Sequence, residues 1–169
     1  MESSKVSEIL DYLCQHVGGD WLLVGGALVQ IELSAERATE DIDLALISHP
    51  TKSEAVAQNE LFQYSMKQLN IGPESVNLAV APFLNDFRGW QSECKLLKSG
   101  SIGNILRPSL TLFVALKLGR ASTIDLKDIG LALEKLPRSE LNEVRLKEWL
   151  TPEKFQRFLA LKASAKSVQ

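Results

Sequence analysis

The sequence predicts an α/β (α+β) fold, in which a small mixed sheet is flanked by helices and followed by a helical C-terminal half. Segments with strand character alternate with segments of helical spacing over the first half of the chain. A glycine-containing stretch within 93–107 then suggests a hairpin, and every periodic segment beyond residue 107 is helical. This order is typical of a sheet domain to which further helices are attached.

The first half of the chain opens with a helix predicted over 3–17, where apolar residues recur at helical spacing after serines suited to an N-cap. Gly18 and Gly19 are expected to end this helix. The continuous apolar run at 21–24 predicts a buried strand, and 27–33 predicts a short helix. Residues 41–48 alternate between apolar and other side chains, which predicts a second strand.

The middle of the chain continues this pattern. Residues 53–69 have helical spacing, 75–83 alternate as a third strand would, and 93–107 suggest a hairpin turning near SGSIG. Four helices are then predicted over 108–120, with Pro108 in the first turn, and over 122–136, 139–150 and 151–164. We therefore expect a sheet domain over 1–106 and a helical region over 107–169 that completes the site, the two forming a single compact unit.

The composition of the chain limits the classes of protein to which it can belong. The chain has 169 residues, is 45% hydrophobic and carries a formal net charge of −2, so it can form a core and has no overall positive field for nucleic acid. Cys14 and Cys94 lie far apart, without metal-ligand spacing. No apolar run approaches the roughly 20 residues that cross a bilayer, and no signal peptide is recognised at MESSKVSEIL. We expect a soluble cytoplasmic protein with no membrane partner.

Two carboxylates interrupt the second predicted strand. Asp41 and Asp43 are expected on the same face, about 7 Å apart along the backbone. Carboxylates held this close repel each other unless a cation lies between them or they share a proton, and hard oxygen ligands favour Mg²⁺ or Mn²⁺. The alternative is that both aspartates lie on the solvent face of an edge strand and have no function.

A pair of glycines precedes these aspartates. Gly25 and Gly26 follow a predicted strand and begin a predicted helix, so backbone N–H groups and the positive helix end can hold phosphate oxygens there. The alternative is an ordinary tight turn. Neither a third glycine nor a Gly-Lys-Ser/Thr sequence follows, which excludes the dinucleotide fingerprint and the P-loop.

Together, these residues resemble the signature of the DNA polymerase beta-like nucleotidyltransferase superfamily: a Gly-Gly or Gly-Ser turn, a helix, and Asp-x-Asp on the next strand. The stretch R-x-T-x-DIDL, which begins at Arg37 and includes Thr39, is similar to the bacterial branch that contains the AbiE-type and MenT-type toxins. That branch later carries an apolar helix with a lysine, then an arginine and an Asp-x-x-Asp helix. Here these positions are occupied by Lys117, Arg120, Asp125 and Asp128. The resemblance covers residues 20–136.

The resemblance implies a metal-dependent nucleotidyltransferase. Mg²⁺ (or Mn²⁺) would bind Asp41 and Asp43, with the triphosphate of a nucleoside triphosphate (NTP) against Gly25 and Gly26. Lys117 would contact phosphate oxygens, and Asp125 or Asp128 would orient Lys117 or assist the nucleophile, while Arg37 and Thr39 would line the pocket. The acceptor would be a tRNA 3′ end, a protein hydroxyl or a small molecule. The implied setting is a toxin–antitoxin or phage-defence system with a cognate antitoxin.

One position departs from the family pattern. Many members carry a third carboxylate on the strand after Asp-x-Asp, whereas this chain has Asn77, which is uncharged and cannot act as a base. An alternative reading is therefore a non-catalytic nucleotide-sensing or partner-binding module with a degraded site. Lys117 has an alternative reading too, as a lysine whose stem packs at a helix end, and Asp125 as a residue that favours the N-terminus of its helix.

Overall fold

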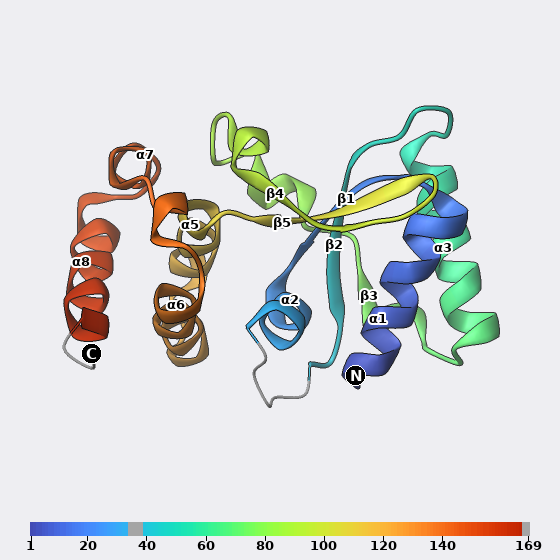
Figure 1. Cartoon of the computed structure of the whole chain (residues 1–169), viewed down its shortest axis with the longest axis horizontal. Coiled ribbons are helices and arrows are strands. Elements are labelled where there is room, and N and C mark those ends of the chain that lie inside the picture. Colours follow the sequence, from blue (N-terminus) through green and yellow to red (C-terminus); the bar gives the residue numbers. More distant parts are fainter. Residues whose placement is uncertain (34–38, 167–169) are drawn as a thin grey trace. The chain divides into compact units, whose positions relative to one another are not determined.

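The computed structural model describes residues 1–33 and 39–166, and it divides into two compact units. The first unit consists of Met1–Pro82 and Cys94–Arg107, and the second of Phe83–Glu93 and the chain from Pro108 onward. The first contains a five-stranded sheet and the second is built from helices (Figure 1). The predicted α+β fold class with a helical C-terminal half is confirmed.

The sheet of the first unit is mixed, with the strand order β3-β2-β1-β5-β4. Central strand β1 runs antiparallel to β2 and parallel to β5, and β2 runs parallel to β3. The strands are β1 (Gly19–Val24), β2 (Ile42–Ser48), β3 (Val76–Asn77), β4 (Cys94–Ser99) and β5 (Gly103–Pro108). The predicted hairpin is therefore present as β4 and β5.

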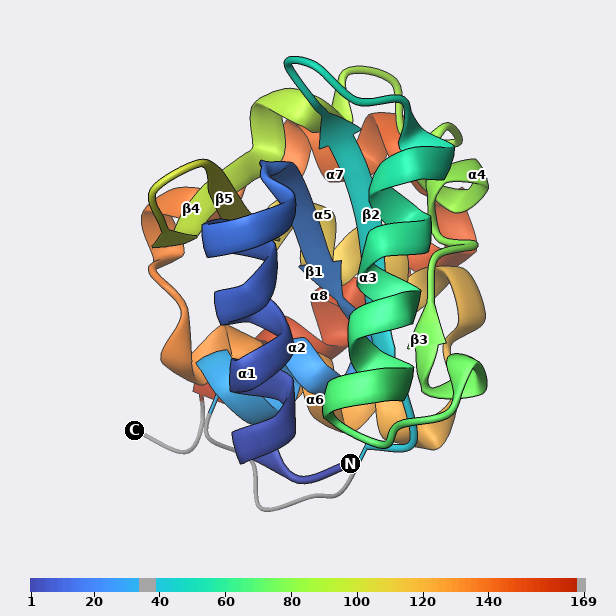
Figure 2. The ribbon, with the colours of Figure 1, turned by 90° about the vertical axis from the view of Figure 1, so that its right-hand side faces the viewer.

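Helices α1 (Ser3–Tyr12) and α3 (Glu54–Gln68) lie side by side over one face of β1 and β2 (Figure 2). A π-helical turn, Leu13–Val17, extends α1, so the helix predicted over 3–17 changes its hydrogen-bond pattern near its end. Helix α2 (Gly25–Glu32) follows β1 directly. The core between these elements is apolar and fully buried at Ile9, Leu13, Trp21, Leu22, Leu23, Leu44 and Leu61.

The third strand is much shorter than the sequence predicts. The alternating stretch 75–83 forms only the two-residue strand β3, preceded by a 3₁₀ turn at Pro73–Ser75 and followed by the short helix α4 (Ala81–Leu84). The reason is local: the side-chain oxygen of Asn77 accepts a hydrogen bond from the N–H of Ala79 at 3.0 Å. This side chain-to-backbone turn draws the chain away from the sheet before it can continue alongside β2.

The second unit contains α5 (Leu110–Arg120), α6 (Thr123–Lys135), α7 (Glu143–Trp149) and α8 (Pro152–Lys166). Helix α6 packs against both α5 and α8 (Figure 1). The prediction that Pro108 lies in the first turn of α5 is wrong, because Pro108 ends β5. Ser109 is the N-cap instead, and its hydroxyl accepts from the N–H of Leu112.

Residues 83–93 belong to the second unit. The segment ends in the 3₁₀ turn Trp90–Glu93, which makes polar contacts with the rest of this unit. The backbone oxygen of Glu93 accepts from the N–H of Ser109 at 2.6 Å, and its carboxylate accepts from the Ser109 hydroxyl at 2.5 Å. Arg145 on α7 donates to the same carboxylate at 3.0 Å. Among the described residues, no helix combines the length and the apolar character that a membrane crossing requires.

Candidate active site

The first part of the candidate site is formed where β1 ends. The register of β1 and β2 pairs Val24, the last residue of β1, with Asp43, so the chain turns into α2 at Gly25 directly beside the Asp43 side chain. Of the residues singled out in the sequence, the structure therefore brings Gly25 and Asp43 together.

Gly25 can only be glycine in this arrangement. Its φ is +69°, in the left-handed region that side chains disfavour, and a Cβ atom there would lie 1.7 Å from Oδ2 of Asp43. Gly25 is also the first residue of α2, so the carboxylate of Asp43 lies at the positive end of this helix. Gly26 follows it and is buried in the first turn. Gly25 thus makes room for the carboxylate at a helix N-terminus.

A hydrogen bond holds the second oxygen of Asp43. In the parallel register of β2 and β3, Asp43 pairs with Asn77, and Nδ2 of Asn77 donates to Oδ1 of Asp43 at 2.7 Å. The two oxygens of Asp43 are therefore placed by different neighbours, Oδ1 by Asn77 and Oδ2 against Gly25.

Asp41 directly precedes β2 and is half-buried, as is Asp43. Ile42 between them is fully buried, as expected for an alternating strand whose carboxylates turn away from the core. Thr39 is buried, and its hydroxyl donates to the backbone oxygen of Asp41 at 2.9 Å, so Thr39 fixes the chain that leads into the strand. Arg37, the other predicted pocket residue, lies outside the described residues.

Helix α2 is anchored to the sheet by an ion pair that the sequence did not indicate. Arg107 on β5 is largely buried, and its Nε lies 3.0 Å from Oε1 of Glu32 in the last turn of α2. This ion pair holds the C-terminal end of α2 against the sheet.

The donor set suits a small hard cation. Carboxylate oxygens are the ligands that Mg²⁺ and Mn²⁺ prefer, and Gly25 has no side chain that would cover Oδ2 of Asp43. Over 1–33 and 39–166, no group of three or more His, Cys, Asp or Glu side chains could hold a metal ion. Because Mg²⁺ usually takes one or two carboxylates together with water and substrate phosphates, two aspartates suffice for such a site.

A second cluster lies within the helical unit and contains the other predicted residues. Lys117 on α5 is almost fully buried, and its ammonium lies 2.6 Å from Oδ2 of Asp128 and 3.3 Å from Oδ1 of Asp125. Both aspartates are on α6 and are also buried. The spacing of three residues puts them on one side of the helix, where both reach the lysine.

Asp125 has two further partners. Ser122 and Asp125 form a capping box at the start of α6, and the Ser122 hydroxyl also donates to the Asp125 carboxylate at 2.7 Å. Arg120, whose side chain is 72% exposed, donates to the same carboxylate at 3.0 Å. Burial by itself raises the pKa of Asp125, but the Ser122 hydrogen bond and the charges of Lys117 and Arg120 outweigh it. The pKa of Asp125 is therefore lowered from 3.8.

Besides the ion pair of Arg107 and Glu32, sequence reasoning missed one contact of Asp125 and one of Asp43. The spacing Ser122-x-x-Asp125 is a capping-box signal, and it could have indicated that the serine holds the aspartate. Asn77 was recognised only as a missing carboxylate. Its donor role depends on the strand that lies opposite, for which the sequence of β3 holds no direct signal.

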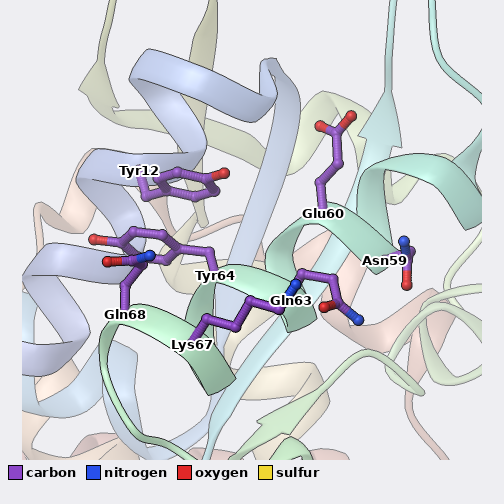
Figure 3. A pocket seen from close by; sticks show the side chains of 7 residues that line it. All are labelled: Tyr12, Asn59, Glu60, Gln63, Tyr64, Lys67 and Gln68. Atoms are coloured by element: carbon purple, nitrogen blue, oxygen red, sulfur yellow. The ribbon is translucent and has the colours of Figure 1, made fainter.

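An open hollow of about 450 Å³ lies elsewhere on the sheet unit, along α1 and α3 (Figure 3). Tyr12 and Tyr64 form one side of it, with their rings stacked at 3.6 Å between centroids. Polar side chains of α3 form the rest: Asn59, Glu60, Gln63, Lys67 and Gln68. None of the residues predicted for the nucleotide site lines this hollow.

Comparison with protein families, with curated proteins and with solved structures gives no significant match to this chain.

Proposed function

We propose that this protein is a metal-dependent nucleotidyltransferase, which transfers a nucleoside monophosphate from an NTP to an acceptor. The observation that carries the proposal is the contact between Gly25 and Asp43. A left-handed glycine at the start of a helix, with no room for a Cβ atom beside a strand carboxylate, suits a site where phosphate and a carboxylate-bound cation meet.

Each residue of the sheet unit has a role in this proposal. Asp41 and Asp43 would hold Mg²⁺ (or Mn²⁺), which when bound neutralises the charge of the triphosphate. The amides of Gly25 and Gly26 would contact phosphate oxygens at the positive end of α2. Arg37 and Thr39 would line the same pocket. In the reaction, an acceptor hydroxyl oxygen bonds to the α-phosphorus, the bond from that phosphorus to the bridging oxygen breaks, and pyrophosphate leaves.

The helical cluster supplies the remaining proposed groups. Lys117 would contact phosphate oxygens as a point charge, oriented by the two aspartates that hold its ammonium. Asp125 or Asp128 would orient Lys117 or take the proton of the attacking hydroxyl, and the lowered pKa of Asp125 disfavours the second role for that residue. That Lys117 completes the site of Asp41 and Asp43 stays a prediction.

A second candidate function is a non-catalytic module that senses a nucleotide or binds a partner. Two observations favour it: Asn77 cannot act as a base, and the Lys117 charge is already balanced by two buried carboxylates. The first candidate accounts for more of the chain, because the Gly25-Gly26 turn, the Asp41 and Asp43 pair and Lys117, to which the resemblance gives roles in transfer, are all present together.

The biological setting also belongs to the proposal. We infer that the protein acts in the cytoplasm, without a membrane partner, as a toxin of a toxin–antitoxin or phage-defence system with a cognate antitoxin. Its acceptor is a tRNA 3′ end, a protein hydroxyl or a small molecule. Since the net charge is −2, a tRNA end would be held by a local basic pocket rather than by a long backbone footprint.

The test is label transfer from α-³²P-labelled NTPs, with Mg²⁺ or Mn²⁺, to total cellular RNA, protein or small molecules. Asp43→Asn should abolish transfer. Asp20→Asn is the matched control, because Asp20 lies on β1 of the same sheet and accepts hydrogen bonds from Asn104 and Ser48. Transfer that survives Asp43→Asn at the wild-type rate contradicts the assignment of Asp43. Tight NTP binding without transfer to any acceptor supports the binding module instead.

A further inference from the structure

We propose that Asn77 is a positioning residue for Asp43 and does not itself bind the metal, an inference that rests on the proposed function of this site. The uncharged amide at position 77 then has a defined role. It leaves a site with two negative ligands, in which a neutral donor holds one ligand in place.

The orientation of the Asn77 amide is determined by its two neighbours. The backbone N–H of Ala79 is only a donor, so the atom that faces it at 3.0 Å must be the amide oxygen. An ionised Asp43 is only an acceptor, so the atom that faces its Oδ1 at 2.7 Å must be the amide nitrogen. Both requirements are met by one amide orientation, and exchanging oxygen and nitrogen would break both bonds.

This orientation leaves the Asn77 oxygen unsuited to a cation. Its contact with Ala79 closes the turn that ends β3, so the oxygen is directed along its own chain rather than toward Asp43. The nitrogen that does face Asp43 carries two protons and cannot be a ligand. Asn77 therefore acts through Asp43, as outer partners of metal-binding carboxylates commonly do.

The hydrogen bond also defines which oxygen of Asp43 is placed for a ligand. Oδ1 is engaged by Asn77, and Oδ2 lies against the Gly25 backbone at the start of α2. Without the Asn77 donor, Oδ1 of Asp43 would lose the hydrogen bond that holds it at 2.7 Å, and the carboxylate would be positioned less firmly against Gly25.

A carboxylate at position 77 should change metal binding in the opposite direction from the loss of the Asn77 side chain. The substitution Asn77→Asp would keep the acceptor for the Ala79 N–H but would replace the donor by an oxygen facing Oδ1 of Asp43. Two carboxylate oxygens at hydrogen-bond distance repel unless a cation joins them. An aspartate here should therefore add a metal ligand, whereas alanine should only remove support from the existing one.

The experiment measures Mn²⁺ binding by electron paramagnetic resonance, with and without ATP, on the full chain. Asn77→Ala should weaken Mn²⁺ binding about tenfold, and Asn77→Asp should strengthen it. Asn104→Ala is the matched control, since Nδ2 of Asn104 donates to Oδ1 of Asp20 at 2.8 Å across β5 and β1 of the same sheet. It should leave Mn²⁺ binding within twofold of wild type.

Opposite shifts for two substitutions at one position cannot arise from a loss of stability. The proposal is overturned if Asn77→Ala binds Mn²⁺ as well as Asn104→Ala does, or if Asn77→Asp also weakens binding. Asn77→Asp keeps the turn at Ala79, so it serves where Asn77→Ala fails to fold.

A metal-free measurement separates this inference from the proposed function. In ¹⁵N-labelled protein, one side-chain amide proton of Asn77 should be shifted downfield by the Asp43 carboxylate and should move upfield in Asp43→Ala. If wild type binds neither Mn²⁺ nor ATP, the proposed function fails, and the positioning of Asp43 by Asn77 is then judged from this signal alone. An Asn77 amide signal that Asp43→Ala leaves unchanged overturns the positioning role.

Discussion

Gly25→Ala should be among the most disruptive small substitutions in the sheet unit. The alanine would have to adopt the left-handed backbone conformation of Gly25, and its methyl group would lie 1.7 Å from Oδ2 of Asp43. The backbone conformation alone costs about 1–2 kcal/mol. Relieving the clash moves the Asp43 carboxylate away from Asn77, and a hydrogen bond to a charged group contributes about 1.5–3 kcal/mol. The expected loss in free energy of unfolding is therefore about 2.5–5 kcal/mol.

The chain offers a control for the backbone part of this loss. Gly89 also has a left-handed φ, +75°, but a Cβ atom there would meet only Nη2 of Arg145, at an ordinary 3.8 Å. Gly89→Ala should therefore cost only about 1–2 kcal/mol. The difference between the two variants measures the contact with Asp43.

Urea unfolding of both variants and of the double variant Gly25→Ala/Asp43→Ala provides the assay. In the absence of the Asp43 carboxylate, Gly25→Ala should cost no more than Gly89→Ala, which gives a coupling energy of about 2 kcal/mol between positions 25 and 43. If Gly25→Ala costs the same as Gly89→Ala in the presence of Asp43, the contact that supports the proposed site is refuted.

Three further predictions concern the helical cluster and the ligand. Lys117→Ala should take the buried ammonium away from Asp128 and from Asp125, of which Asp125 still has Arg120, and should destabilise the protein by about 3–5 kcal/mol. It should also lower turnover at least about 100-fold. In urea unfolding, the control Arg120→Ala removes a mostly exposed cation and leaves Lys117 beside Asp125, so it should cost less than about 1 kcal/mol. Because the pKa of Asp125 is lowered on folding, the contribution of this carboxylate to stability is present above pH 3.8 and is lost as the pH falls through the folded-state pKa. The acid end of a curve of stability against pH should therefore be flatter for Asp125→Asn. A curve identical to that of the wild type would contradict this assignment. Mg²⁺ with an NTP should raise the melting temperature, because a hundredfold excess of ligand over Kd adds about 2.7 kcal/mol to the free energy of unfolding. No shift with any NTP at millimolar concentration would count against the transferase and against a nucleotide-sensing module, whereas a partner-binding module requires no shift.

Local patterns in the sequence predicted the strand and the turn of the candidate site, although they missed two local features: the Asn77 side-chain turn that shortens β3 and the Ser109 cap that begins α5. The alternation around Asp41 and Asp43 predicted the strand and its buried Ile42, because side chains of a strand point to opposite faces regardless of its neighbours. The Gly25-Gly26 pair indicated the strand-to-helix turn, since a change of hydrophobic period marked both elements. The α+β class followed from the same local periods.

Tertiary structure decided the contacts between residues that are distant in the chain. Nothing in the sequence of β3 indicates that its neighbour is β2, yet that pairing makes Asn77 the hydrogen-bond donor of Asp43. The same amide closes the turn at Ala79, and that competition with the sheet explains why the alternating stretch 75–83 forms only a two-residue strand.

The two motifs of the candidate site show the same division between local and tertiary causes. The sequence by itself determined which residue types lie on which element: two carboxylates on a strand, glycines at a helix start, and a lysine and two aspartates on successive helices. Only the tertiary structure decided that Asp43 packs against Gly25 and that Lys117 is buried between Asp125 and Asp128. The physical reason is that periodicity sets the direction of a side chain within its own element, whereas charge neutralisation and steric fit depend on the element that packs opposite.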